Sequence, residues 1–129
     1  MKPLTRTLKS RLAVCAVAAL SVFAALPATA QDRYPSQPIK IVVPFPAGGG
    51  TDALTRQLAT ALTTKLNWVI IVENKPGAGG NLALDSVAKS RPDGYTFVMA
   101  QTDNVVLNPL LYTKLTYDPV NDLEAVVPV

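Results

Sequence analysis

Residues 42–62, VVPFPAGGGTDALTRQLATAL, give the clearest indication of the fold. A short β-branched run meets two prolines and three consecutive glycines, and a helical pattern follows at once. A strand that passes through glycines directly into a helix opens an α/β unit. Glycines at such a junction let a ligand approach the backbone closely, because no side chain stands in the way. The stretch therefore predicts a strand, a loop able to bind a ligand, and a helix.

The same pattern recurs further along the chain. A second glycine-rich segment, ENKPGAGG, follows another apolar run, and a third apolar run follows the turn RPDG. Short β-branched runs bounded by turn residues predict strands, and apolar residues at helical spacing predict helices. The expected strands are 39–43 and 69–72, both buried, and 95–100. The expected helices are 52–66, a second helix that Asn81 caps, and a short one at 105–111. Residues 117–124 are expected to form a turn and a helix start.

Three details of the expected helices can be tested. Thr51 or Asp52 is expected to cap the first helix, since their side-chain oxygens accept free amides. Asn67 is expected to close it in a left-handed conformation. Leucines recur every fourth residue and predict one apolar stripe. These leucines are Leu54, Leu58, Leu62 and Leu66. In the second helix, Leu84, Val87 and Ala88 share the apolar face.

The order of elements is strand, helix, strand, helix, strand, which predicts an α/β fold with a parallel, doubly wound sheet. Ligands of such sheets bind beyond the carboxyl ends of the strands. Three loops follow these ends: the first loop (44–52), the second loop (73–81) and the third loop (101–104). They are therefore expected to open on one edge of the sheet.

The composition of these loops favours a small anion. Helix N-termini carry unpaired amides and a favourable dipole for negative charge. Thr51, Asn81, Thr102 and Asn104 add polar side chains, whereas Lys75 is the only cation in the three loops. A carboxylate or phosphate held mainly by backbone amides fits this pattern. The alternative, that these are ordinary turn glycines, stays open.

The amino-terminal segment has the layout of a secretory signal peptide. Residues 1–11 are basic, residues 12–26 are almost wholly apolar, and Ala28-Thr29-Ala30 forms a cleavage site. The apolar run is shorter than the roughly 20 residues of a membrane-spanning helix. We therefore expect a signal peptide at 1–30, a polar tail at 31–38, and export to the periplasm.

Composition excludes several function classes. Four of the 12 basic residues and none of the 9 acidic residues lie in the leader, so the remainder carries a net charge of −1 and no basic patch for nucleic acid. Histidine is absent, and the only cysteine, Cys15, lies in the leader. Within these residues, Ser-His-Asp and Cys-His catalysis and histidine-ligated metal sites are thereby excluded. No cofactor is indicated.

One enzymatic alternative fits the pattern in part. Residues 48–53, GGGTDA, match the dinucleotide-binding fingerprint between a strand and a helix, and Glu73 stands where a ribose-binding acid would. An exported protein has little access to nicotinamide cofactors, and this hypothesis leaves the second glycine loop unexplained. It remains the second hypothesis: an exported nucleotide-binding, Rossmann-like enzyme.

Four segments together resemble one known family. They are YPSQPIKIVVPFPAGGGTD (34–52), VENKPGAGGN (72–81), AKSRPDGYTFVMA (88–100) and NPLLYTKLTYDPVNDLEAV (108–126). The chain resembles the extracytoplasmic solute receptors of tripartite tricarboxylate transporters, the Bug-type receptors. Such a receptor has a periplasmic-binding-protein-like fold, whose two α/β lobes close on a ligand.

The resemblance implies a function without catalysis. These receptors capture a small carboxylate and pass it to a membrane permease. Their ligands are dicarboxylates, tricarboxylates, acidic amino acids or aromatic acids. It also implies that residues 39–129 form part of a first lobe, with the second lobe and the C-terminal return absent from this sequence.

The resemblance also implies which residues bind. The first loop would grip one carboxylate, partly through ordered water, the second loop would face it, and the third would add polar contacts. The implied ligand-binding residues are Phe45, Ala47, Gly48, Gly49, Gly50, Thr51, Asp52, Gly77, Ala78, Gly79, Gly80, Asn81, Thr102 and Asn104. Phe45 fits simple core packing equally well. For Asp52 we favour a structural role that orders the first loop, because an acid would repel an anionic ligand.

One departure from the family pattern precedes the second expected strand. The family usually has Gly-Gln-Pro there, and this chain has Asn67-Trp68-Val69. Trp68 is expected at the amino end of the strand, far from the site.

Overall fold

The computed structural model describes residues 33–129 and contains a three-stranded sheet. Its strands are β1 (Ile39–Val43), β2 (Ile70–Asn74) and β3 (Thr96–Val98). The strand order is β2-β1-β3 and both pairings are parallel, with Val42 opposite Glu73 on one side and Val98 on the other. The predicted signal peptide, residues 1–30, lies outside the described residues.

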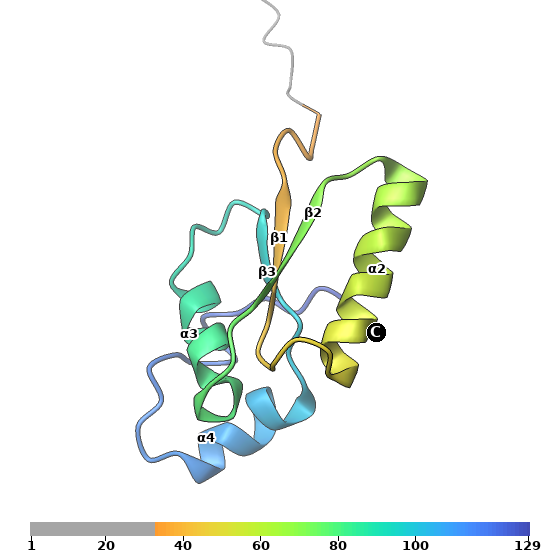
Figure 1. The fold of residues 1–129 in the computed structure, drawn as a ribbon. Coiled ribbons are helices and arrows are strands. Elements are labelled where there is room, and N and C mark those ends of the chain that lie inside the picture. Colours follow the sequence, from red (N-terminus) through yellow and green to blue (C-terminus); the bar gives the residue numbers. More distant parts are fainter. Residues whose placement is uncertain (1–32) are drawn as a thin grey trace, which may run out of the picture. The chain divides into compact units, whose positions relative to one another are not determined.

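Helices connect the strands on the two faces of this sheet. Helix α2 (Gly50–Leu66) leads from β1 to β2, and the 3₁₀ turn η1 (Ala78–Gly80) with helix α3 (Asn81–Ala88) leads from β2 to β3. Figure 1 shows α2 and α3 on opposite sides of the sheet. Because the chain adds one strand to each side of β1, right-handed crossovers require this placement. The predicted parallel, doubly wound α/β fold is confirmed. None of the helices within residues 33–129 is long and apolar enough to cross a membrane.

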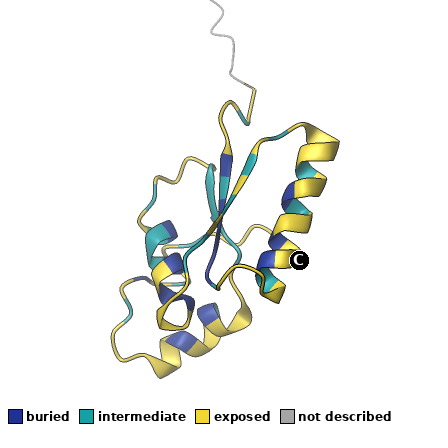
Figure 2. Cartoon of the chain, in the orientation of Figure 1, coloured by how far each residue is buried: buried dark blue, intermediate teal, exposed yellow. Residues whose placement is uncertain are grey.

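The core lies between β1 and α3. Val43 in the central strand is fully buried, and Val42 packs with Ala83, Leu84 and Val87 of α3. Figure 2 shows buried residues concentrated along β1 and on the inner faces of the helices. The predicted apolar face of the second helix is therefore confirmed. Burial of each such aliphatic side chain stabilises the fold by about 1.5–3 kcal/mol.

Strand β2 differs from its prediction. It begins at Ile70 rather than at Val69 and continues through Asn74, so Glu73 and Asn74 belong to the strand. The expectation of a fully buried strand was wrong, since Ile71 is 50% exposed and exposure alternates along the strand. The physical reason is its position at the sheet edge, where only one face of β2 is covered.

Helix α2 confirms its predicted end and corrects its predicted start. Asn67 ends the helix in the left-handed region, with φ of 57°. The helix begins at Gly50, and Gly49 is the N-cap residue without a side-chain cap bond, so the predicted capping by Thr51 or Asp52 was wrong. The leucine stripe was also misplaced. The residues that α2 buries are Asp52, Thr55 and Ala59, whereas Leu54 and Leu66 are about half exposed. A strict four-residue repeat drifts around a helix of 3.6 residues per turn, which explains why its ends leave the core face.

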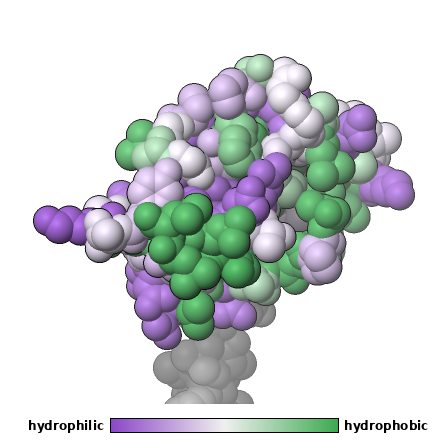
Figure 3. Space-filling model, turned by 90° about the horizontal axis from the view of Figure 1, so that it is seen from below, coloured by the Kyte–Doolittle hydropathy of each residue, from purple (hydrophilic) through white to green (hydrophobic). Residues whose placement is uncertain are grey.

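The remaining elements surround the carboxyl edge of the sheet. Strand β3 covers fewer residues than the predicted 95–100, and a π-helical turn, η2 (Asp103–Leu107), runs into helix α4 (Asn108–Leu111). Figure 3 shows an apolar patch on this end of the molecule. The exposed apolar side chains of η2 and α4 are Val106, Leu107, Leu110 and Leu111.

Residues 117–124 form a turn but no helix. The Asp118 carboxylate accepts the backbone amides of Val120 and Asn121, at 2.8 and 3.1 Å. These local bonds compete with helical ones, so the predicted helix start was wrong.

Aromatic residues pack at the opposite, amino edge of the sheet. The ring of Tyr34 lies 5.8 Å from that of Trp68 in an edge-to-face arrangement and 5.0 Å from that of Tyr95. The Tyr95 hydroxyl accepts the amide of Ser36 at 2.9 Å. These contacts attach residues 33–38, which contain no helix or strand, to the edge distant from the three loops.

Candidate functional site

The three predicted loops meet at the carboxyl edge of the sheet (Figure 1). Side-chain hydrogen bonds connect them directly. Gln101 Nε2 in the third loop donates to Thr51 Oγ1 in the first at 2.7 Å, and Asn104 Nδ2 donates to the carbonyl of Gly79 in the second at 2.7 Å. The predicted convergence is therefore confirmed. It follows from the parallel strands, whose carboxyl ends share an edge.

The first loop presents free backbone donors. The first intrahelical bond of α2 runs from the amide of Ala53 to the carbonyl of Gly49, at 2.9 Å. The amides of Gly50, Thr51 and Asp52 therefore have no acceptor inside the helix. They stand at the positive end of the dipole of a 17-residue helix. This arrangement suits a carboxylate or phosphate oxygen.

The space above the first loop is open. A Cβ atom added at Gly50 would meet nothing within 4 Å, and one at Gly49 would meet only the carbonyl oxygen of Pro46 at 3.5 Å, an ordinary contact. Backbone strain requires glycine only at Gly48, where φ is +85°. Packing within the described residues thus gives no reason for glycine at the other two positions. Close approach of a ligand gives one.

The buried side chain of Asp52 stabilises the first loop through hydrogen bonds. Its side chain is 4% exposed, and its Oδ2 accepts the amide of Gly48 at 2.8 Å. Its Oδ1 accepts Asn74 Nδ2 at 2.9 Å, and Arg56 Nε lies 3.0 Å from both oxygens. The hydrogen bonds from Arg56, followed by those from Gly48 and Asn74, hold the pKa of Asp52 well below its usual range. The carboxylate is committed to internal bonds, which supports the structural role favoured from the sequence.

The end of β2 completes this contact. Asn74 Nδ2 also donates to the carbonyl of Phe45 at 3.1 Å, and Asn74 Oδ1 accepts Arg56 Nη2 at 3.0 Å. Asp52, Arg56 and Asn74, which we call the loop clamp, thereby attach the first loop to the neighbouring strand. Phe45 is half-buried, and Ala47 beside the glycines is exposed.

The second loop has a different reason for its glycines. Four successive residues have positive φ: Gly77, Ala78, Gly79 and Gly80. Cβ atoms added at Gly77, Gly79 and Gly80 would lie 2.7 Å from Leu82 Cδ1, 2.8 Å from the Tyr112 hydroxyl and 2.5 Å from Asn104 Nδ2. Backbone conformation and packing therefore require these glycines without any ligand.

A buried polar cluster anchors the second loop. We define it as Asn81, Asn104, Asn108 and Tyr117, each at most 8% exposed. Both Asn104 and Asn108 donate side-chain amides to the carbonyl of Gly79, and Asn81 Oδ1 accepts Asn108 Nδ2 at 2.6 Å and the Tyr117 hydroxyl at 2.9 Å. Gly80 is the N-cap residue of α3, so the predicted capping by Asn81 was wrong. The side chain of Asn81 instead accepts hydrogen bonds from Asn108 and Tyr117 within the cluster.

The third loop contributes two kinds of residue. Thr102 is exposed at the start of η2. Asn104 is fully buried, and its Oδ1 accepts the amide of Gln101 at 2.9 Å, so it stabilises the loop. The ligand contacts expected from the sequence for both residues stay predictions.

Sequence reasoning missed four residues that shape this edge: Arg56, Asn74, Asn108 and Tyr117. Most of their partners lie in other elements, and the longest of these links, from Tyr117 to Asn81, spans 36 residues. One signal was local: Arg56 follows Asp52 by four residues on a helix, the spacing of an ion pair.

Comparison with known proteins places this chain in a family. The model of the "Tripartite tricarboxylate transporter family receptor" matches residues 54–129. A curated relative, the "UPF0065 protein in gbd 5'region" of Cupriavidus necator, is 41% identical over 119 residues, which are 92% of this chain and 36% of the relative. The chain thus spans about a third of that relative's length.

Solved structures agree with this result. "R. palustris Rpa4515 with adipate" superposes with a TM-score of 0.65 at 37% identity, over 67% of this chain and 29% of that one. "MatC (Rpa3494) from Rhodopseudomonas palustris with bound malate" gives a TM-score of 0.65 at 36% identity, over 69% and 30%. The sequence of this chain, together with its fold and its converging loops, thus assigns it to the receptor family of the tripartite tricarboxylate transporters.

Proposed function

We propose that this chain forms one wall of the ligand site of a periplasmic solute receptor, which binds a small carboxylate and delivers it to membrane permease subunits. The observation that carries the proposal is the first loop, where the free amides of residues 50–52 adjoin open space at Gly49 and Gly50. Adipate and malate in the similar solved structures support a carboxylate as the ligand. Residues 39–129 would then be part of one lobe, and residues 1–30 the signal peptide.

The two glycine loops take different parts in this proposal. The amides of the first loop bind one carboxylate group, and Thr51 adds its hydroxyl. The second loop faces it with the backbone of residues 77–79, which the polar cluster holds in place. Affinity comes mainly from backbone amides, since amide bonds to an oxyanion contribute roughly 1.5–3 kcal/mol each. The family match favours this receptor over a nucleotide-binding enzyme.

Calorimetric titration of the full-length gene product tests the proposal. The ligands are malate, adipate, an acidic amino acid, an aromatic acid and a tricarboxylate. Gly49→Val is the main variant, because Gly49 has φ of −76° and room for a side chain, so the loop can keep its conformation. We expect at least tenfold weaker binding, equal to the loss of about one such bond.

Lys75→Ala is the matched comparison, since it removes the only lysine of the three loops without touching the first. We expect it to change affinity less than Gly49→Val does. A protein that binds none of these ligands would exclude the proposed function. If Gly49→Val binds like wild type while Lys75→Ala abolishes binding, a cationic site has to replace the amide site.

A further inference from the structure

The first loop contains an electrostatic conflict. The amides proposed to bind an anion belong to Gly50, Thr51 and Asp52, and Asp52 itself carries a carboxylate. That side chain is 4% exposed, so water screens its charge poorly. The same carboxylate accepts the amide of Gly48 at 2.8 Å, which places it directly beneath the loop. Without compensation, this negative charge would repel the proposed ligand.

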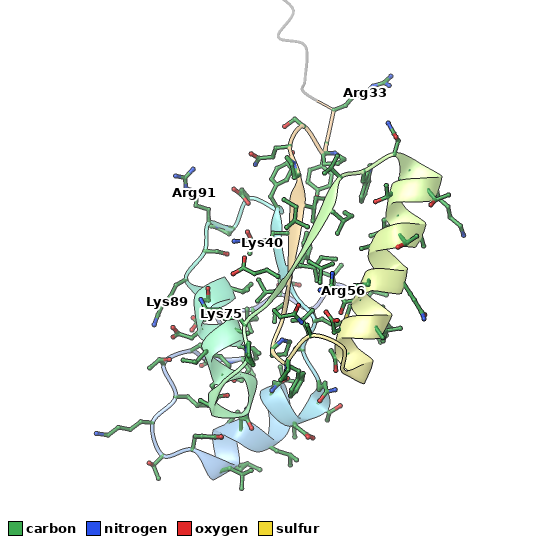
Figure 4. The ribbon with its side chains drawn as sticks, in the orientation of Figure 1. Arg33, Lys40, Arg56, Lys75, Lys89 and Arg91 are labelled. Atoms are coloured by element: carbon green, nitrogen blue, oxygen red, sulfur yellow. The ribbon has the colours of Figure 1, made fainter. Side chains whose placement is uncertain are left out.

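Arg56 is positioned to compensate this charge. Its Nε lies 3.0 Å from both carboxylate oxygens of Asp52, and its Nη2 lies 3.0 Å from Oδ1. In Figure 4 its side chain lies between α2 and the sheet, whereas Lys75 lies on the side of α3. The other ion pairs found within residues 33–129 join Lys40 to Glu73 and Lys89 to Asp85. Arg56 is therefore the cation paired with Asp52 in the described part of the chain.

The contact between Arg56 and Asp52 belongs to a larger hydrogen-bond network, unlike a simple surface ion pair. Arg56 also donates to Asn74 Oδ1 at 3.0 Å, and Asn74 Nδ2 bonds both Asp52 and the carbonyl of Phe45. The guanidinium is thus held by two acceptors from different elements. Its outer edge stays in solvent, at 51% exposure, so its remaining charge is partly screened.

We propose that Arg56 is a charge-compensating positioning residue of the ligand site. It neutralises the Asp52 carboxylate and, through Asn74, fixes the first loop, so that the free amides face the ligand with a net positive potential. It touches no ligand itself. This inference rests on the proposed function, because compensation matters only if the loop binds an anion.

Charge-matched variants of the full-length gene product test the inference by titration with malate and adipate. Arg56→Gln leaves Asp52 uncompensated, and we expect at least tenfold weaker binding. The double variant Asp52→Asn with Arg56→Gln removes both charges, and we expect affinity within about threefold of wild type. Arg56→Lys keeps the charge and is expected to retain most of the affinity. Arg91→Gln removes an exposed arginine that points away from the sheet (Figure 4) and should have no effect.

The double variant separates charge compensation from a purely structural role. If Arg56 only holds the loop, removing the Asp52 carboxylate as well breaks a further charged bond and binding stays at the Arg56→Gln level or falls. Restored binding supports compensation, and unrestored binding overturns it. Circular dichroism establishes that each variant is folded. Should Arg56→Gln fail to fold, the double variant alone decides: affinity within about threefold of wild type supports compensation, and a tenfold loss overturns the inference.

The two proposals can fail separately. A wild-type protein that binds no carboxylate overturns both. A wild-type protein that binds malate or adipate, with Arg56→Gln binding equally well, overturns the inference and leaves the proposed function standing.

Discussion

Replacing Gly80 by alanine should destabilise the protein strongly. Gly80 has φ of +92°, and the new Cβ would lie 2.5 Å from Asn104 Nδ2 and 3.0 Å from Pro44 Cβ. Left-handed backbone costs a non-glycine residue roughly 1–2 kcal/mol. Overpacking a filled core adds about 1–3 kcal/mol. We therefore expect the free energy of unfolding to fall by about 2–5 kcal/mol, a large part of the roughly 5–15 kcal/mol of a typical domain.

The reason for the upper end of this range is that Asn104 has little freedom to move. Its amide bonds the carbonyl of Gly79, and its Oδ1 accepts the amide of Gln101. Displacing the side chain would break both bonds inside the fold, where unpaired polar groups are costly.

Urea unfolding followed by circular dichroism measures the effect, with Gly50→Ala as the matched control. Gly50 is the first residue of α2 and has nothing within 4 Å of its Cβ position, so we expect a change below about 1 kcal/mol there. Equal unfolding midpoints for the two variants, with equal slopes, would show that packing does not require glycine at this position of the second loop.

Three further predictions concern other parts of the chain. The mass of protein recovered from the periplasm should begin at Gln31, and a mass that retains the leader would exclude the predicted cleavage. Asn67→Ala should lower the free energy of unfolding by about 1 kcal/mol because alanine resists the left-handed conformation at φ of 57°, whereas Asn67→Gly should be nearly neutral; equal losses in thermal unfolding would contradict this. The pKa of Asp52 is lowered in the folded state, chiefly by Arg56, so its contribution to stability is complete above the ordinary aspartate pKa of about 3.9 and is lost as pH falls below it. Urea midpoints measured from pH 7 to pH 3 should therefore fall more steeply for wild type than for Asp52→Asn, and parallel curves would exclude the assignment.

The fold and the first loop could be predicted from sequence because their signals are local. Strand, glycines and helix follow one another within residues 39–66, and their order alone fixes parallel strands with loops at one edge. Asn67 could be recognised as a helix end for the same reason.

The polar cluster could not be predicted, because its partners are distant in sequence. The glycines of the second loop look like those of the first, yet Asn104, Asn108 and Tyr112 decide which atoms surround them. The edge position of β2 likewise depends on strand order rather than on its own residues. The four-residue repeat of leucines predicted one buried face for α2, but packing against the sheet determined which face is buried.

The aromatic contacts at the amino edge have a practical consequence for spectroscopy. Trp68 is the only tryptophan of this chain, and it packs against Tyr34 at the edge opposite the three loops. A five-residue strand of about 3.3 Å per residue separates the two edges. The indole emission of this chain would therefore change when residues 33–38 detach. It would change little when a ligand binds at the three loops. A fluorescence titration without signal would consequently be no evidence against binding, and a probe placed beside the first loop would be needed to follow the ligand.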